Sequence, residues 1–189
     1  SEDRYANPGG PITAPRPGGR VIRQTGNAIH LTGTGASPNG DRPFLDRLDL
    51  RSFETERLFQ SADDAYEVVA AVLSDDGRSV LTRRETRVEP PNYYVRDTAG
   101  GSIRTITSFP DPAPQLTGIS KELVTYERAD GVQLSGTLYM PPGYREGERV
   151  PMVMWAYPRE FVDPQLAGQV TGSDNRFTAI RGASHLLLL

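Results

Sequence analysis

The chain has 189 residues, a net charge of −3 and a mean hydropathy of −0.48, so it can hold one large domain or two small ones. This charge gives no electrostatic case for nucleic acid or an anionic membrane, and no aromatic and basic stripe is present that could stack on bases. Cysteine is absent, which excludes disulfides and thiolate metal sites. No apolar run approaches the roughly 20 residues that span a bilayer, and no signal-peptide pattern opens the sequence, so it assigns no compartment.

Residues 1–20 are rich in proline and glycine and show no periodicity, which predicts an irregular connection. Short strands are expected after it, because alternating or β-branched apolar residues are separated by turn residues about every ten positions. The expected strands are 21–24, 28–34, 44–50, 54–60, 66–73, 79–85, 93–97 and 102–107. Residues 74–77, which read Ser-Asp-Asp-Gly, form a strong turn signal in this series. The alternation over 44–50 is imperfect and predicts a half-buried strand.

These eight strands fall into two groups of four, which suits two blades of a β-propeller. A β-sandwich would produce nearly the same pattern, so both architectures remain open on the pattern alone. Two blades cannot close a ring of typically 4–8 blades. On the propeller interpretation, the chain is therefore expected to be a piece of a larger protein.

The composition changes after the proline-rich linker 110–114. Two strands are expected over 122–128 and 133–140, joined by a tight turn that contains Asp130 and Gly131. Residues 150–156 are almost continuously apolar, which predicts a strand buried on both faces, as in a parallel sheet covered by helices. The predicted fold is thus mainly β with an α/β portion, divided into domains 1–118 and 119–189.

The expected buried strand ends at Tyr157, where polar residues begin. Ligands of open α/β sheets bind outside the carboxyl ends of the strands, so Tyr157 is the first candidate functional residue. The alternative is that its ring caps the core with the hydroxyl in water.

Residues 162–176 are predicted to form a loop over the sheet. Ser184 is a possible N-cap for a first helical turn over 185–189, although four leucines could also form a strand.

A complete catalytic constellation is missing from the sequence. Residues 182–186 begin like the Gly-x-Ser-x-Gly nucleophile elbow but have leucine in place of the closing glycine, which argues against Ser184 as a nucleophile. His30 lies within a strand pattern and His185 at a helix start, so structural roles are favoured for both. No cluster has the spacing of a metal site and no phosphate loop is present, so no cofactor is expected.

Several segments nonetheless resemble the prolyl oligopeptidase clan (S9) of serine peptidases, and within it the glutamyl endopeptidase branch. They are 2–5, 43–46, 107–110, 121–124, 130–134, 138–144, 155–161, 167–170 and 175–177. The most specific pieces are the Tyr-Pro-x-Glu-Phe motif over 157–161 and the Ala-Gly-Gln-Val motif over 167–170. The resemblance therefore runs nearly end to end.

The resemblance implies a β-propeller followed by an α/β-hydrolase domain, with the Ser, Asp and His of the triad beyond Leu189. The chain would be the last blades and the first hydrolase strands, inactive alone, in an enzyme that acts on peptides. In the family, the tyrosine at the position of Tyr157 donates its hydroxyl to the oxyanion hole. Pro158 and Arg159 depart from the Tyr-Gly-Gly or His-Gly-Gly of related peptidases but resemble the glutamyl branch.

Arg159 is a candidate for pairing with an acidic substrate side chain, because a guanidinium matches a carboxylate in a bidentate pair. The alternatives are an exposed arginine or a structural pair with Glu160.

For the whole chain, two other functions stay open. The strands could form a non-catalytic surface that binds a peptide or protein partner, or the hydrolase machinery could act on esters.

Overall fold

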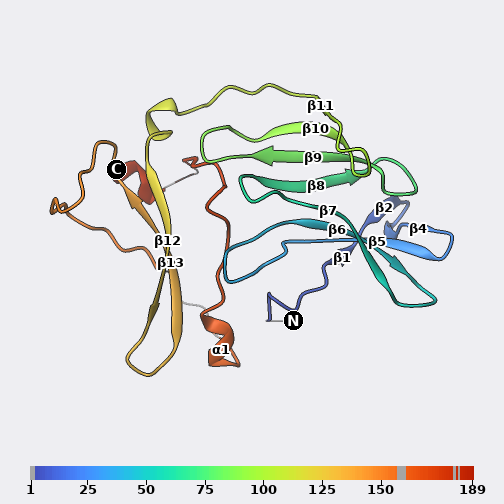
Figure 1. The fold of residues 1–189 in the computed structure, drawn as a ribbon, viewed down its shortest axis with the longest axis horizontal. Helices are drawn as coiled ribbons and strands as arrows, with labels where there is room; N and C mark the ends of the chain where they lie inside the picture. Colours follow the sequence, from blue (N-terminus) through green and yellow to red (C-terminus); the bar gives the residue numbers. More distant parts are fainter. Residues whose placement is uncertain (1–2, 157–160, 181, 183) are drawn as a thin grey trace.

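The computed structural model describes residues 3–156, 161–180, 182 and 184–189, and strands make up most of its regular structure (Figure 1). The first sheet has the order β1-β5-β6-β7, with β4 also paired to β5. Its strands are β1 (Gly10–Pro11), β4 (Gln24–Thr25), β5 (Ala28–Gly33), β6 (Phe44–Asp49) and β7 (Thr55–Gln60). The second sheet has the order β11-β10-β9-β8, made of β8 (Tyr66–Val72), β9 (Ser79–Glu85), β10 (Asn92–Asp97) and β11 (Ile103–Thr105). All of these pairings are antiparallel.

Seven of the eight predicted strands are observed in two sheets, whereas the strand predicted over 21–24 is divided between β4 and the separate strand Gly19–Ile22. A buried core joins the two sheets. Leu45 and Phe59 from the first sheet pack with Val72 and Val80 from the second, and all four are at most 9% exposed. Two antiparallel sheets that share a core fit adjacent propeller blades and also a sandwich. Among the described residues, no ring of blades closes.

A β-bulge interrupts the pairing of β6 with β7. Leu45 lies opposite Phe59 and Asp46 lies opposite Arg57, so Leu58 on β7 is the extra residue. Phe44, Leu45 and Asp46 are all buried, so both faces of β6 are covered at its start. This strand is therefore more deeply buried at its start than the half-buried strand that the sequence predicted.

The expectation of an irregular segment over residues 1–20 holds for residues 3–9 but is wrong for residues 10–20. β2 (Thr13–Arg16) and β3 (Gly19–Ile22) form a two-stranded antiparallel hairpin, and β1 joins the first sheet. Gly18 takes a φ of +84° in the turn, a conformation in which glycine avoids the strain of a side chain. Backbone pairing thus orders a stretch whose side chains carry no apolar period.

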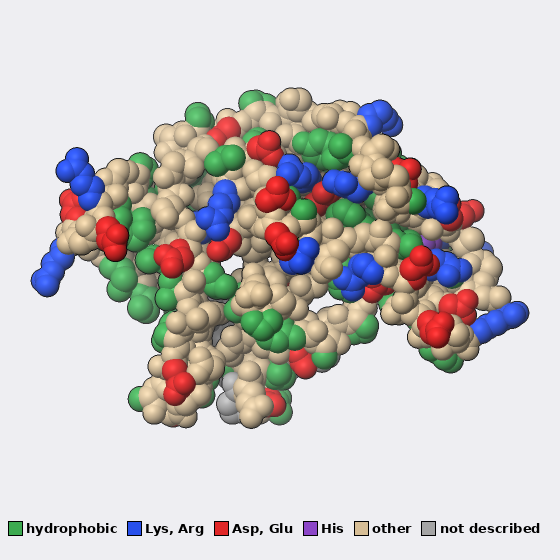
Figure 2. Space-filling model, in the orientation of Figure 1, with side chains coloured by type: hydrophobic (Ala, Val, Ile, Leu, Met, Phe, Trp, Pro, Cys, Tyr) green, Lys and Arg blue, Asp and Glu red, His purple; other side chains and the backbone are tan. Residues whose placement is uncertain are grey.

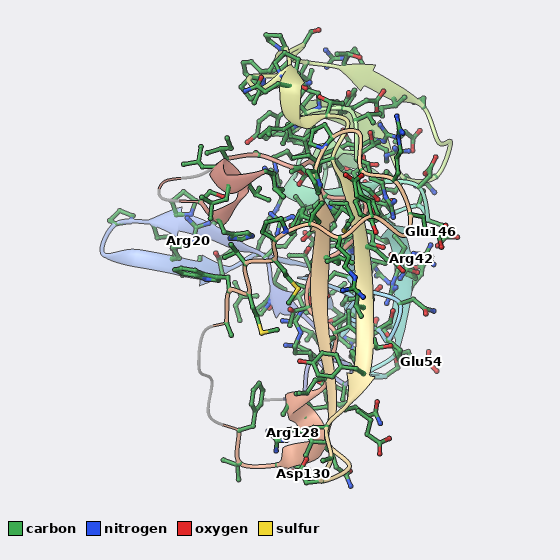
Figure 3. The ribbon with its side chains drawn as sticks, turned by 90° about the vertical axis from the view of Figure 1, so that its left-hand side faces the viewer. Arg20, Arg42, Glu54, Arg128, Asp130 and Glu146 are labelled. Carbon is green, nitrogen blue, oxygen red and sulfur yellow. The ribbon has the colours of Figure 1, made fainter. Side chains whose placement is uncertain are left out.

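The second part of the chain contains a long hairpin, β12 (Ser120–Glu127) and β13 (Gln133–Met140), which follows the short 3₁₀ helix Pro114–Leu116. The turn predicted at Asp130 and Gly131 closes it, and Figure 3 shows Arg128 and Asp130 at its tip. Gly131 has a φ of +86°, as such a turn requires. The position of the domain boundary near residue 118 stays a prediction.

Two short helices follow the hairpin. The α-helix α1 (Pro164–Ala167) begins after Asp163, whose side chain accepts a hydrogen bond from the amide of Gln165, so the loop predicted over 162–176 contains one helical turn. The predicted N-cap Ser184 accepts from the amide of Leu186 at the start of a 3₁₀ helix, His185–Leu188. In Figure 1 the segment between these helices runs between the β12–β13 hairpin and the two sheets.

The strand expected over residues 150–156 is not formed. These residues belong to no sheet, and Met152, Met154 and Trp155 are 73%, 77% and 72% exposed. A strand buried on both faces needs paired neighbours and covering layers. The described residues supply neither, because β12 and β13 pair only with each other. The predicted α/β portion is therefore not observed in the part of the chain that the structure describes.

Candidate functional site

Tyr157 and Arg159, the two site residues predicted from the sequence, lie outside the described residues, as does Glu160. Their roles stay predictions. The segment just before them, residues 150–156, does not form the buried strand that was predicted to end at Tyr157. The structure instead brings together other segments that the sequence singled out, and the candidate site is built from these.

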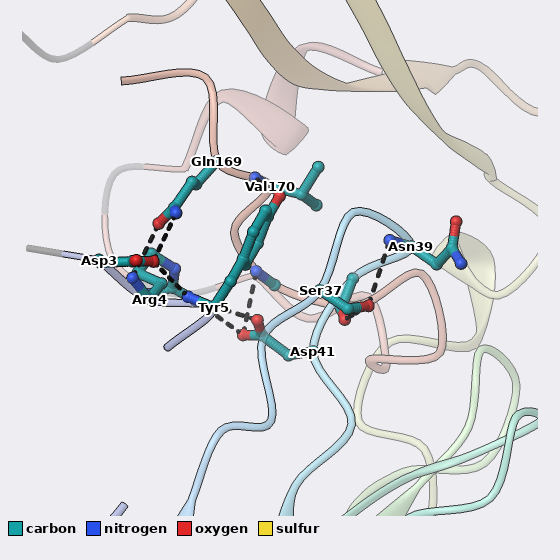
Figure 4. Close-up of polar contacts among 10 residues, drawn as sticks. Asp3, Arg4, Tyr5, Ser37, Asn39, Asp41, Gln169 and Val170 are labelled. Atoms are coloured by element: carbon teal, nitrogen blue, oxygen red, sulfur yellow. Dashed lines mark hydrogen bonds and ion pairs between the residues drawn. The ribbon is translucent and has the colours of Figure 1, made fainter. Parts of the chain in front are cut away.

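An N-terminal clasp, defined here by residues 3–5, Asp41 and residues 169–172, joins segments more than 160 positions apart (Figure 4). The backbone amide of Arg4 donates to Oε1 of Gln169 at 2.8 Å, and Nε2 of Gln169 donates to Oδ1 of Asp3 at 2.7 Å. The hydroxyl of Tyr5 accepts from the amide of Val170 at 2.8 Å. Two motifs that carry the family resemblance are thus in direct contact.

Asp41 is the buried anchor of this clasp, with 6% of its surface exposed. Its carboxylate accepts hydrogen bonds from the guanidinium of Arg4 at 3.0 Å and from the amide of Gly172 at 3.1 Å. Its own amide donates to the carbonyl of Gly172 at 2.7 Å. The clasp therefore fixes the backbone of residues 169–172 against the loop that precedes β6.

Beside the clasp lies a polar cavity of about 330 Å³. Its walls come from the loop before β6, from the β12–β13 hairpin and from residues 170–179. Its polar and charged lining includes Asn39, Lys121, Tyr139, Asp174 and Arg176. A volume of this size falls at the lower end of small-molecule sites, which span roughly 300–1,000 Å³.

Lys121, at the start of β12, is the single lysine in a sequence with 20 arginines. It is only 8% exposed, and its ammonium donates to the carbonyl of Arg176 at 2.5 Å. Burial disfavours the charged amine and lowers its pKa to about 8, with the carboxylate of Asp174 opposing the shift. An arginine would stay charged at this position, whereas this amine titrates near neutral pH.

The carboxylates near Lys121 already have cationic partners. Asp174 pairs with Arg87 at 3.2 Å. Glu85, 2% exposed, pairs with Arg83 at 3.3 Å and with Arg176 at 3.8 Å, and it also accepts from the amide of Phe177. No carboxylate of the described residues lies within ion-pair distance of Lys121. The cavity therefore holds one cationic group that no described acid neutralises.

Tyr139 contributes an aromatic ring to the lining of the cavity. The pKa of Tyr139 is raised by burial, so its phenol stays neutral near pH 7. The ring of His185 packs edge-on to Tyr139 at 5.9 Å between centroids and stacks with Trp155 at 6.4 Å. His185 thus makes structural aromatic contacts, in line with the role predicted from the sequence.

Other kinds of site receive little support from the described residues. Within them, no group of three or more His, Asp or Glu side chains could hold a metal ion. On the face drawn in Figure 2, basic and acidic side chains are interspersed rather than gathered in a patch of one sign. In the described part of the chain, no helix is long and apolar enough to cross a membrane.

Lys121 lies in one of the segments that resemble the family, 121–124, and no sequence pattern assigns it a role. Its burial and its hydrogen bond to the carbonyl of Arg176 depend on contacts across 55 positions, which no local pattern predicts. One signal was available, because a lone lysine among many arginines marks a position where a titratable amine occurs instead of a permanent charge.

Comparisons with known proteins find relatives that are named as glutamyl endopeptidases. No protein-family model matches the chain. All of the chain aligns at 41% identity with a protein from Oryza sativa subsp. japonica named "Probable glutamyl endopeptidase, chloroplastic", and at 37% identity with the Arabidopsis thaliana protein of the same name. The chain spans 22% of the length of each of these curated relatives.

Similarity to solved structures is weaker. The AtxE2 isopeptidase without ligand aligns with 76% of this chain and 22% of its own, at 16% identity and a TM-score of 0.44. TolB from Acinetobacter baumannii aligns with 63% of this chain and 25% of its own, at 21% identity and a TM-score of 0.29. At this level of similarity, the solved structures do not assign the fold.

Proposed function

We propose that this chain is part of a serine peptidase of the prolyl oligopeptidase clan that cleaves peptide bonds after acidic residues. The observation that supports the proposal is the 41% and 37% identity to two proteins named as glutamyl endopeptidases, over all of this chain. The chain spans 22% of the length of those proteins. The proposed Ser, His and Asp belong to the part of the protein beyond Leu189, as the family resemblance implies. The serine attacks the scissile carbonyl while the histidine takes its proton.

The proposed role of Tyr157 is to stabilise the tetrahedral intermediate. A phenol held at the edge of the reacting carbonyl donates a hydrogen bond to the developing oxyanion, and one such donor lowers the barrier by about 2.7–4 kcal/mol. Arg159, two residues further on, is proposed to pair with the carboxylate of the acidic substrate side chain. This role is secondary, because an ion pair with Glu160 would occupy the same guanidinium.

The test uses the full reading frame in which this chain occurs. Two peptides that differ only by Glu or Gln before the scissile bond are compared, and the Glu peptide is expected to be hydrolysed faster. Tyr157→Phe is expected to lower kcat by about 10²–10³-fold with little change in KM. An unchanged kcat would refute the role of Tyr157.

Two further measurements separate the rival functions. A fluorophosphonate reagent is expected to label the full-length protein at a serine, whereas a non-catalytic binding module would not react. An esterase would turn over an ester substrate while leaving the matched peptide intact. Either of these two rival results would overturn the proposed peptidase activity.

A further inference from the structure

The charges around the polar cavity do not balance. Lys121, Arg83, Arg87 and Arg176 face only two described carboxylates, Glu85 and Asp174. The three arginines are committed to those carboxylates, and the guanidinium of Arg176 also lies 5.1 Å from the ring centroid of Tyr66. Two positive charges remain over these two carboxylates, and of the four cations only Lys121 has no described carboxylate within ion-pair distance.

Lys121 also has hydrogen-bonding capacity to spare. An ammonium has three donors, and the described residues give this one a single acceptor, the carbonyl of Arg176. A buried charge without a counter-ion is costly, and an anion that enters the cavity would relieve that cost. Lys121 is one of the residues that line the cavity, so a ligand there would lie next to its side chain.

We propose that the polar cavity binds a carboxylate group, held by an ion pair to Lys121. The one ammonium without an ion-pair partner offers a place for a single carboxylate, and Asp174 in the cavity wall repels a second negative charge on the ligand, as in phosphate. The cavity of about 330 Å³ admits a small acid. The carboxylate comes either from an acidic side chain of a peptide or from a free dicarboxylic acid. This inference concerns binding alone and stands whether or not the protein cleaves peptides.

Binding should be linked to proton uptake. Burial holds the pKa of the free amine at about 8, and an ion pair with a carboxylate raises it. Above pH 8 the empty site is increasingly neutral, so affinity falls by up to tenfold for each further pH unit. The other groups that face the amine are Glu85, Arg87, Asp174 and Arg176, with neutral Tyr139 on the neighbouring strand.

Because Lys121 is the only lysine, amine chemistry reports on the site directly. The chain is treated with an amine-selective acylating reagent and modification of Lys121 is followed by peptide mass mapping, which separates it from the N-terminal amine. Four additives are compared: glutarate, a blocked peptide containing Glu, its Gln counterpart and inorganic phosphate. Protection by the Glu peptide but not by the Gln peptide is expected, with affinities that differ by about tenfold or more.

Each result of this comparison decides the proposal. Protection by the Glu peptide alone identifies a peptide side chain as the source of the carboxylate, and protection by glutarate alone identifies a free acid. Stronger protection by phosphate than by either carboxylate overturns the proposal. Equal protection by the Glu and Gln peptides, or none by any additive at millimolar concentration, also overturns it.

Two variants provide matched controls, with binding measured by calorimetry. Lys121→Met keeps the length of the side chain without the charge and is expected to remove the preference for Glu over Gln. Lys121→Arg keeps the charge and is expected to bind the Glu peptide without the loss of affinity above pH 8. Should Lys121→Met fail to fold, a pH profile of Lys121→Arg that matches the unmodified chain would still refute the role of the amine.

Discussion

His30 is a buried histidine in the middle of β5, and its environment favours the neutral ring. It is 4% exposed, and its Nε2 has no hydrogen-bond partner among the described residues. Burial lowers its pKa below the usual 6.5, and Arg23 adds to this effect, while a hydrogen bond with the backbone of Asp76 opposes it. The sequence predicted the structural role but not the missing partner, which depends on the packing of the loop around Gly77.

This environment predicts a pH-dependent stability. Between the lowered folded-state pKa and the unfolded value near 6.5, the unfolded chain binds more protons, so the free energy of unfolding falls as the pH falls through this window. His30→Asn removes the titration, and its free energy of unfolding should fall less steeply from pH 7 to pH 5. Urea unfolding of both proteins across this range measures the difference. Parallel pH profiles would show that His30 is not the group responsible.

Glycine is required at position 168 because the backbone of Gln133 lies too close to leave room for a side chain, and not because of a positive φ. A Cβ at this position would lie 2.1 Å from the carbonyl oxygen of Gln133 on β13, which packs α1 against the hairpin. Gly168→Ala is therefore expected to lower the free energy of unfolding by about 1–3 kcal/mol. Gly136→Ala, on β13 with no atom within 4 Å of the added carbon, is the matched control and should change stability little. Equal effects of the two substitutions in urea unfolding would contradict this packing.

Among the elements, those defined by local patterns were the ones that the sequence predicted. The turn at Asp130 and Gly131 joins β12 and β13 in an uninterrupted register, and the turn over 74–77 joins β8 and β9, whose register shifts between Val69 and Ala71. The β2–β3 hairpin was missed because its four-residue strands carry no apolar period. The clasp was missed because it depends on side chains that fold together from distant segments, although two of its motifs carried the family resemblance.

The clasp predicts that Asp41 holds residues 169–172 in place. Asp41→Ala removes the acceptor for Arg4 and for the amide of Gly172, and should lower the free energy of unfolding by about 1.5–3 kcal/mol. Hydrogen exchange should speed up at residues 169–172 while that of the β8–β9 pair stays close to its original rate. Asp130→Ala, which removes an exposed pair with Arg128, is the control and should leave these amides protected. Unchanged exchange in Asp41→Ala would mean that the clasp does not hold this segment.

At the scale of the whole molecule, the largest disagreement between sequence and structure concerns residues 150–156. Their apolar run predicted a doubly buried strand, and the structure leaves it exposed and unpaired. Composition can indicate that a segment prefers burial, but burial itself needs partners, and a run of apolar residues does not specify which elements supply them. Tyr157 and Arg159 follow this segment in the sequence. The predicted oxyanion site therefore depends on whether residues 150–156 form a buried strand.

The single tryptophan makes this disagreement measurable. Trp155 is 72% exposed in the structure, so its fluorescence in the monomeric chain should have the emission of a hydrated indole and be readily quenched by acrylamide. The exposed apolar run should also drive self-association at higher concentration. Combining Met152→Ser, Val153→Thr and Met154→Ser should reduce this association in sedimentation velocity while changing the free energy of unfolding by less than about 0.5 kcal/mol. A shielded Trp155 in the monomer, or a large loss of stability in the triple variant, would instead place residues 150–156 in the packed interior that their sequence predicted.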